Sequence, residues 1–359
     1  MKKLLPFIWG LIIATSACTK SSDKPGSGTS TGTATVTTIN PNIYVAGFDG
    51  NTGLHDTAVY WKNNATTHLS DGTALAGARS VVVSGTDVYV AGGLFNAKIG
   101  TKEIAAYWKN GVITYLTDGT MDAYSYSIFV VGSDVYVAGT ISSNVPATVG
   151  ENGFATYWKN GVAYKMTDGT TSPVAYSIYV SGSDVYVAGC IGSQAVYWKN
   201  GVVNSLPDYS AGSVAYSVVV SGGDVYIAGS VFSPQLGGHA AYWKNGVLTT
   251  LANTLTYSES FNIFVSGSDV YVAGDNVDTS KNNYFATIWK NGVPSTLTPT
   301  VNYTMAKAIF VIGNDVYVAG NKDTEDANGD RLAMYWKNGA PTYLTNGRSF
   351  ADVWSLYVK

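Results

Sequence analysis

A unit of 40 to 50 residues recurs seven times along this 359-residue chain. Each copy holds a stretch like Asp134–Gly139 (Asp-Val-Tyr-Val-Ala-Gly), followed by a stretch like Tyr157–Gly161 (Tyr-Trp-Lys-Asn-Gly). The tryptophans of the second stretch align the seven copies: Trp61, Trp108, Trp158, Trp198, Trp243, Trp289 and Trp336. A repeat constrains the fold strongly because each copy must adopt one shape and stack against its neighbours.

The repeat is built from strand-forming residues. The chain contains 26 Tyr and 9 Trp, and only 13% of its residues are charged. Repeats of this length and composition are typical of β-propellers, in which each repeat is one blade. We therefore predict an all-β fold, a seven-bladed β-propeller with four antiparallel strands per blade, over residues 40–359.

The second copy shows how a blade is built. We expect strands at residues 78–83, 87–91, 105–109 and 112–116. Asn110-Gly111 joins the last two, and Asn-Gly between strands favours a type I′ hairpin, which needs two residues that tolerate positive φ. Six copies have Asn-Gly here, and the first has Asn63-Asn64. Pro294 and Pro341 in the fourth strand indicate that this strand is the outer edge of each blade.

The two ends of the repeat region complete each other. Residues 43–47 match a second strand, and residues 353–358 match a first strand. We expect the C-terminal strand to join the N-terminal blade and so close the ring. Residues 36–39 are the weaker competitor for that place.

On these motifs residues 40–359 resemble seven-bladed β-propellers. The Tyr-Trp-Lys-Asn-Gly block is similar to uncharacterised Trp-Lys-Asn-Gly repeat lipoproteins of Bacteroidota type and, more distantly, to extracellular HAF-type repeat proteins. The Gly-His and Trp-Asp marks of WD40 repeats do not recur from copy to copy. The resemblance implies a fold and an extracellular setting, and no activity for any residue.

The N-terminus reads as a signal peptide over residues 1–17, with Lys2 and Lys3 before a short apolar run. Small residues precede Cys18, which resembles a lipobox whose Cys becomes the lipid anchor, although Thr15 stands where Leu is commonest. Ordinary cleavage after Ala17 is the alternative. Residues 18–39 are rich in Ser, Thr and Gly, as in a flexible tether. We expect a monomeric head lipid-anchored in a bacterial cell envelope, at the outer membrane or cell surface.

Several other functions have little support in the sequence. The net charge is −3 without a basic cluster, which argues against nucleic-acid binding. Cys190 is expected to be a buried apolar side chain and not a nucleophile. No cofactor is expected. Calcium has one weak candidate site, where Asp326, Asn328 and Asp330 alternate, but the downstream Glu of a calcium loop is missing.

Comparison of the seven copies separates scaffold from candidate site. The third-strand Trp and the Asp that begins each second strand repeat almost unchanged, which favours blade packing and local backbone capping. The connections between second and third strands vary, and we expect them on one face. One position of the innermost strand also varies, and it should ring the channel mouth: Arg79, Tyr126, Tyr176, Tyr216, Phe261, Lys307 and Trp354. These residues suit stacking on a ligand, or alternatively packing between blades.

The leading interpretation is a tethered, non-enzymatic propeller that binds a glycan or a protein on the variable face. The alternative is a glycan hydrolase or lyase that uses loop carboxylates. Its candidate acids are Asp56, Glu103, Glu151, Glu259 and Asp278. A purely structural envelope protein is the third hypothesis.

Overall fold

The computed structural model describes residues 40–50, 56–95, 102–143, 152–209, 211–234, 237–251, 257–278, 283–298, 303–324, 330–348 and 350–359. The expected signal peptide, Cys18, the tether and residues 36–39 lie outside these ranges. All regular structure in the described ranges is β-strand. Within those ranges, no helix has the length and apolar character needed to cross a membrane.

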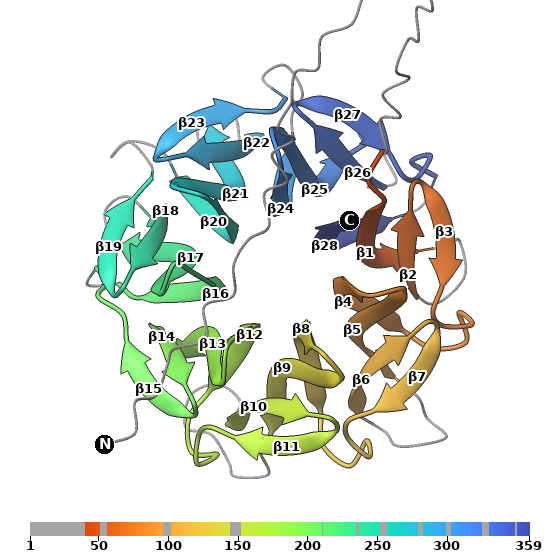
Figure 1. Ribbon diagram of the computed structural model, residues 1–359, viewed down its shortest axis with the longest axis vertical. Coiled ribbons are helices and arrows are strands. Elements are labelled where there is room, and N and C mark those ends of the chain that lie inside the picture. The colour runs from red at the N-terminus through yellow and green to blue at the C-terminus, as the bar shows by residue number, and fades with distance from the viewer. Residues whose placement is uncertain are drawn as a thin grey trace, which may run out of the picture. The chain divides into compact units, whose positions relative to one another are not determined.

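The strands form seven four-stranded antiparallel sheets that surround a central axis, which confirms the seven-bladed propeller (Figure 1). Blade 1 contains β28 (Ala351–Val358), β1 (Ile43–Asp49), β2 (Thr57–Lys62) and β3 (Ala65–His68). Blade 2 contains β4 (Ala76–Ser84), β5 (Asp87–Phe95), β6 (Glu103–Lys109) and β7 (Val112–Tyr115). Blade 3 contains β8 (Ala123–Val131), β9 (Asp134–Ser142), β10 (Gly153–Lys159) and β11 (Val162–Lys165). Blade 4 contains β12 (Pro173–Ser181), β13 (Asp184–Ile191), β14 (Gln194–Lys199) and β15 (Val202–Ser205).

The remaining three blades repeat the same order. Blade 5 contains β16 (Ser213–Ser221), β17 (Asp224–Ser233), β18 (Gly237–Lys244) and β19 (Val247–Thr250). Blade 6 contains β20 (Tyr257–Ser266), β21 (Asp269–Asp278), β22 (Asn283–Lys290) and β23 (Val293–Thr296). Blade 7 contains β24 (Thr304–Ile312), β25 (Asp315–Asp323), β26 (Arg331–Lys337) and β27 (Ala340–Tyr343). The first strand of each blade lies next to the axis and the fourth is the outer edge.

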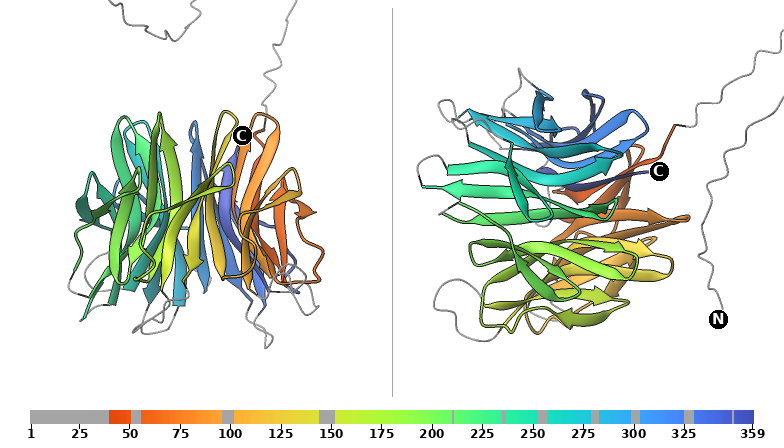
Figure 2. Two further views of the ribbon diagram at one scale, coloured as in Figure 1. Left: turned by 90° about the horizontal axis from the view of Figure 1, so that it is seen from below. Right: turned by 60° about the vertical axis from the view of Figure 1, so that its left-hand side comes forward.

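The ring closes as predicted. β28 pairs antiparallel with β1, from Ile43 opposite Val358 to Asp49 opposite Ala351. The first blade is therefore made from both ends of the repeat region. In the left view of Figure 2 the C-terminal end of β28 lies on the same side as the short hairpin turns.

The hairpin predictions are also confirmed. Asn110 and Gly111 have φ of 50° and 82°, and Asn63 and Asn64 of blade 1 have φ of 48° and 71°. These values are those of a type I′ turn, so Asn replaces Gly at the second turn position without changing the turn. Pro294 and Pro341 lie on β23 and β27, which are outer-edge strands.

The third-strand tryptophans form the core between blades. All seven are at most 1% exposed. Trp108 of blade 2 packs with Tyr44, Ala46 and Ala58 of blade 1, and Trp61 of blade 1 packs in the same way with residues of blade 7. Each Trp thus holds its blade against the preceding one, as the sequence predicted.

The expectation for the second-strand Asp was wrong. Asp87 does not cap local backbone: its carboxylate accepts a hydrogen bond from the Asn110 side chain at 2.8 Å and pairs with Lys109 at 2.8 Å. The Asn110 side-chain oxygen instead accepts from the backbone N–H of Val88. The Lys109 ammonium also lies over Tyr89, 5.2 Å from the ring centroid. The same Asp–Lys pair joins the second and third strands of blades 2 to 7.

Candidate functional site

The variable inner-strand position is a β-bulge in every blade. In β4 the pairing with β5 shifts between Ala78 and Ser80, so that Arg79 is the extra residue. The same shift leaves Tyr126, Tyr176, Tyr216, Phe261, Lys307 and Trp354 as the extra residues of the other six inner strands. A bulge redirects a side chain without breaking the sheet. The scaffold therefore presents one freely variable side chain per blade toward the axis.

An unvaried glycine makes the bulge possible. Opposite each bulge lies the Gly that ends the Val-Tyr-Val-Ala-Gly stretch, such as Gly189 of β13. A Cβ on Gly189 would stand 1.8 Å from the carbonyl oxygen of Val174. The glycines of the other six blades have the same contact at 1.8 to 2.0 Å. Only glycine fits there, which explains why this residue repeats while the bulge residue varies.

The bulge residues form a nearly continuous ring. The ring centroids of Tyr126 and Tyr176 are 5.4 Å apart, and Tyr216 lies 5.2 Å beyond Tyr176. Phe261 follows Tyr216 at 5.8 Å. The Lys307 ammonium lies 5.3 Å from the Phe261 centroid, and the Arg79 guanidinium lies 4.8 Å from Tyr126 and 5.9 Å from Trp354. The structure thus brings all seven predicted residues together, half-buried. We call them the mouth ring.

Hydrogen bonds between inner strands hold the mouth ring in place. The residue after each bulge accepts a hydrogen bond from a backbone N–H of the next blade, as Ser80 accepts from Ile128 at 3.3 Å and Ser177 from Val218 at 3.2 Å. Ser127, Ser217, Asn262 and Ser355 make the equivalent bonds. Ala308 of blade 7 has no hydroxyl with which to accept one. Six of the seven junctions between neighbouring inner strands therefore have such a bond.

The ring tyrosines lie in a low-dielectric setting. Burial raises the pKa of Tyr126, Tyr176 and Tyr216 above the usual phenol range. These side chains are therefore neutral at physiological pH and offer apolar faces with a hydroxyl at the edge. Such a surface suits a flat ligand that carries hydroxyl groups.

A pair of carboxyl groups lies beside the ring. This pair was not predicted from the sequence. Glu259 of β20 is the register partner of Asp275 of β21. Asp275 is 1% exposed and its Oδ1 has no hydrogen-bond partner among the described residues. Burial and the nearby Glu259 raise the pKa of Asp275 to about 7, with Lys307 opposing. Tyr257 donates to Glu259 at 2.5 Å. Asp275 follows the unvaried Gly, where other blades have apolar or neutral residues, and that comparison could have found it.

The other candidate acids are spread around the propeller. Glu103 of β6 pairs with Arg79 at 3.3 Å, and burial raises the pKa of its carboxyl. Asp56 precedes β2 of blade 1, whereas Asp278 ends β21 of blade 6. Glu151 lies outside the described residues. Glu259 and Asp278 lie on blade 6, whereas Asp56 and Glu103 line one small pocket at the junction of blades 1 and 2. The four described candidates therefore fall into two separate groups and do not converge on one point.

Cys190 is buried, and burial raises the pKa of its thiol, so it behaves as an apolar side chain. Of the calcium candidates only Asp330 is described, since Asp326 and Asn328 lie outside the described ranges. In the described part of the chain, no three His, Cys, Asp or Glu side chains are grouped to hold a metal ion.

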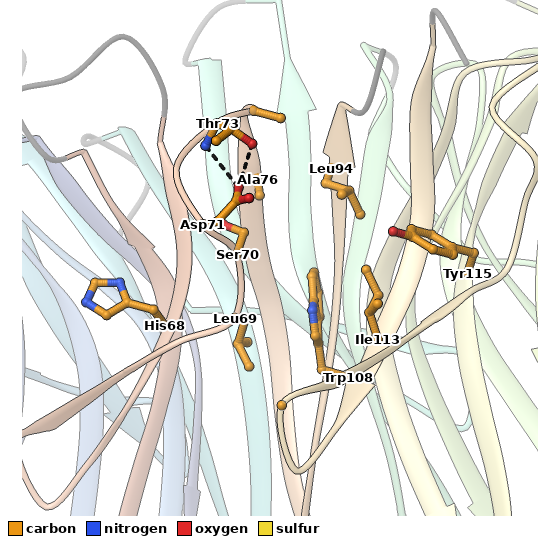
Figure 3. Close-up of a pocket in the computed structure, with 12 residues that line it drawn as sticks. His68, Leu69, Ser70, Asp71, Thr73, Ala76, Leu94, Trp108, Ile113 and Tyr115 are labelled. Atoms are coloured by element: carbon orange, nitrogen blue, oxygen red, sulfur yellow. Dashed lines mark hydrogen bonds between the residues drawn. The ribbon is translucent and has the colours of Figure 1, made fainter. Parts of the chain in front are cut away.

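One cavity belongs to the architecture of the propeller. It is a groove of about 610 Å³ between blades 1 and 2, where Trp108 and Ile113 lie between Leu69 and Tyr115 (Figure 3). A groove of about 450 Å³ recurs one blade further on, lined by equivalents such as Thr117 for Ser70 and Met121 for Ala74. A groove that repeats with the blades is a consequence of their packing. The mouth ring is the better candidate because its residues differ while their placement does not.

The sequence matches no protein-family profile and no curated protein. Solved structures share the fold. A puromycin-hydrolysing peptidase from Mycobacterium tuberculosis is 10% identical with a TM-score of 0.53, over 84% of this chain and 53% of that one. An acylaminoacyl peptidase, solved in complex with a chloromethyl ketone, is 12% identical with a TM-score of 0.50, over 86% and 52%. TolB from Acinetobacter baumannii has a TM-score of 0.46 at 12% identity, over 87% and 63%.

The chain spans about half the length of the two peptidases. At these identities the likeness shows the propeller fold and leaves the choice between binding protein and enzyme open.

Proposed function

We propose that this protein is a non-enzymatic propeller that binds a carbohydrate at the mouth of its channel. The observation that supports this proposal most directly is the mouth ring, in which seven variable side chains lie at seven equivalent bulges. Five are aromatic and two are cationic. If they served only blade packing, the position would be expected to repeat as the third-strand Trp does.

The chemistry of the ring favours a sugar over a protein partner. Aromatic faces stack on the apolar faces of sugar rings, and the adjoining carboxyl and amide groups can accept or donate hydrogen bonds to hydroxyls. A stable protein interface needs about 1,000 Å² or more of contact in total, which seven half-buried side chains offer poorly. A flat hydroxylated ligand suits the aromatic faces of the ring and the polar groups beside them.

The test is a titration of purified protein with neutral hexasaccharides of glucose, mannose and xylose units. Trp354→Ala and Tyr176→Ala should each weaken binding about tenfold or more, because each removes one stacking face. Tyr164→Ala is the control, since Tyr164 is exposed on the outer strand β11. Unchanged affinity in the two ring variants, together with lost stability, would mean that the ring serves packing alone.

One observation favours the enzymatic alternative. In the Glu259–Asp275 pair, burial raises the pKa of Asp275, and glycoside hydrolases use a carboxyl with a raised pKa as their general acid. Against it, Asp275 is too buried to touch a substrate in this conformation. Prolonged incubation with a bound hexasaccharide should give no shorter product. Product that disappears in Asp275→Asn would establish the hydrolase instead.

We propose further that the propeller is held at a bacterial envelope through Cys18. The motif around Cys18 and the polar segment behind it support this setting. Metabolic labelling with a fatty acid should mark the wild-type protein and leave Cys18→Ala unlabelled. Equal secretion of an unlabelled protein in both cases would point to ordinary signal cleavage.

A further inference from the structure

A small pocket adjoins the mouth ring off the axis, at the junction of blades 1 and 2. Its volume is about 210 Å³. Two members of the mouth ring, Arg79 and Trp354, line it. The lining also includes Gly77, Gly93, Glu103, Phe48 and Asp56. We call this the Gly77 pocket.

A glycine pair opens the pocket. Gly77 of β4 is the register partner of Gly93 of β5. The equivalent pairs elsewhere carry side chains on both residues: Tyr124 with Thr140, Val174 with Cys190, Val214 with Ser230, Glu259 with Asp275, Met305 with Asn321 and Asp352 with Phe48. Blade 2 alone has two glycines at this place, and the missing side chains leave the space that the pocket occupies.

The space left by the glycines is lined by functional groups. A Cβ on Gly77 would lie 3.2 Å from the Trp354 indole, and a Cβ on Gly93 would lie 2.6 Å from Oε1 of Glu103. The Trp354 ring is supported from the side by Phe48, with centroids 5.2 Å apart. The pocket therefore joins an aromatic face to a carboxylate in a space that any larger residue would fill.

The polar side of the pocket is incompletely bonded. Arg79 donates through Nη2 to Glu103 at 3.3 Å, whereas its Nη1 is buried with no hydrogen-bond partner among the described residues. An unmade hydrogen bond of a buried charged group costs free energy. A ligand oxygen that meets the guanidinium after a small rotation of the side chain would supply that bond.

We propose that the Gly77 pocket is the anchoring subsite and takes one neutral, hydroxyl-rich sugar ring stacked on Trp354. This inference rests on the carbohydrate-binding function proposed above. The volume lies below the roughly 300 Å³ at which pockets for drug-sized ligands begin, which suits one ring. The lining carries one cation, Arg79, and two acids, Glu103 and Asp56. A uronate carboxylate is therefore disfavoured, while sugar hydroxyls can both donate to Glu103 and accept from Arg79.

The test fills the pocket with residues that other blades already carry. Gly77→Val with Gly93→Thr introduces Val as at Val174 and Thr as at Thr140, so the fold accommodates both types at the equivalent places. Val174→Ala, in blade 4, is the matched control. The probes are the neutral hexasaccharide that binds the wild type most tightly and an oligogalacturonate of equal length.

Wild type should bind the neutral probe at least about tenfold more tightly than the acidic one, and the filled variant should lose at least that factor. Val174→Ala should bind as the wild type does. A filled variant with wild-type affinity would overturn the subsite and leave the mouth ring as the sole contact. Binding of neither class of probe to the wild type would instead refute the carbohydrate function itself.

Glu103→Gln provides a second readout if the filled variant does not fold. The amide keeps the shape and a hydrogen bond to Arg79 but removes a negative charge. Its preference for the neutral over the acidic probe should fall at least severalfold. An unchanged preference would overturn the assigned role of Glu103, and with it the neutral-sugar subsite.

Discussion

Gly189 faces the backbone carbonyl of Val174 so closely that a methyl group there would stand 1.8 Å from the oxygen. This contact connects the repeat to the candidate site. The glycine lets the inner strand bulge, and the bulge turns Tyr176 toward the axis. A residue that does not vary between the copies therefore serves one that does.

Gly189→Ala should destabilise the protein by about 3 kcal/mol, because the clash is with backbone that cannot move aside without displacing the bulge. Chemical unfolding measures the loss. Gly201→Asn is the control, since Asn64 already occupies that turn position in blade 1, and its effect should be small. An equal loss of unfolding free energy in the two variants would show that the contact at the bulge is no more important than the turn position.

Ala308→Ser should stabilise the ring by about 1 kcal/mol. It adds the acceptor that Ser177 and its equivalents supply in six inner strands, here for the backbone N–H of Leu356. Ser177→Ala removes one such bond and should cost a similar amount. The unfolding midpoints of the two variants should therefore move in opposite directions, and a shift of the same sign in both would contradict the role of these bonds.

Asp275 should make the folded protein less stable as the pH rises from about 4 to about 7. Burial raises its folded-state pKa to about 7, so the unfolded chain releases this proton first. Each pH unit of that window weakens folding by roughly 1.4 kcal/mol from this group. Asp275→Asn should flatten the dependence and be relatively more stable above pH about 7. If the free energy of unfolding depends on pH identically in the variant and the wild type, the pKa of Asp275 is not raised in the folded protein.

The Asp–Lys pairs between second and third strands should have the opposite effect, because their contribution to stability is lost as the pH falls. Hydrogen bonds from Lys199 and Asn200 lower the pKa of Asp184, and five other blades repeat this. Their contribution is present above the unfolded pKa of about 4 and is lost as the pH falls through the folded value. Asp184→Asn should be less stable than wild type at pH about 7, and the difference should shrink as the pH falls below about 4. A difference that persists at low pH would refute the ionic origin.

The fold could be predicted from the repeat because each strong local signal has one structural solution. Asn110-Gly111 requires a type I′ turn, and β28 could be matched to β1 because both ends keep the repeat pattern. The register of the bulges could not be predicted. A one-residue shift in pairing depends on the contact of Gly189 with Val174, which no local pattern reveals.

The candidate site was predictable in part for the same reason. Comparison of copies found the mouth ring, because variation at one position stands out against constant neighbours. It missed Asp275, which a comparison of the residues after the unvaried Gly would have found. It also missed the Gly77–Gly93 pair, which becomes notable only when the strands are paired across the sheet. The role of Asp87 was misjudged because its partners lie elsewhere in the repeat, Lys109 at the end of β6 and Asn110 in the turn that follows.

The most direct test of the mouth ring as a carbohydrate site is hydroxyl-radical footprinting with and without a saturating neutral hexasaccharide. Modification read by mass spectrometry compares the ring residues Trp354 and Tyr176 with Tyr115 and Tyr343, which are exposed on outer strands. The proposed function predicts protection of Trp354 and Tyr176 on binding and none of the outer tyrosines. Protection confined to the outer strands, or none in the ring under saturation, would contradict it.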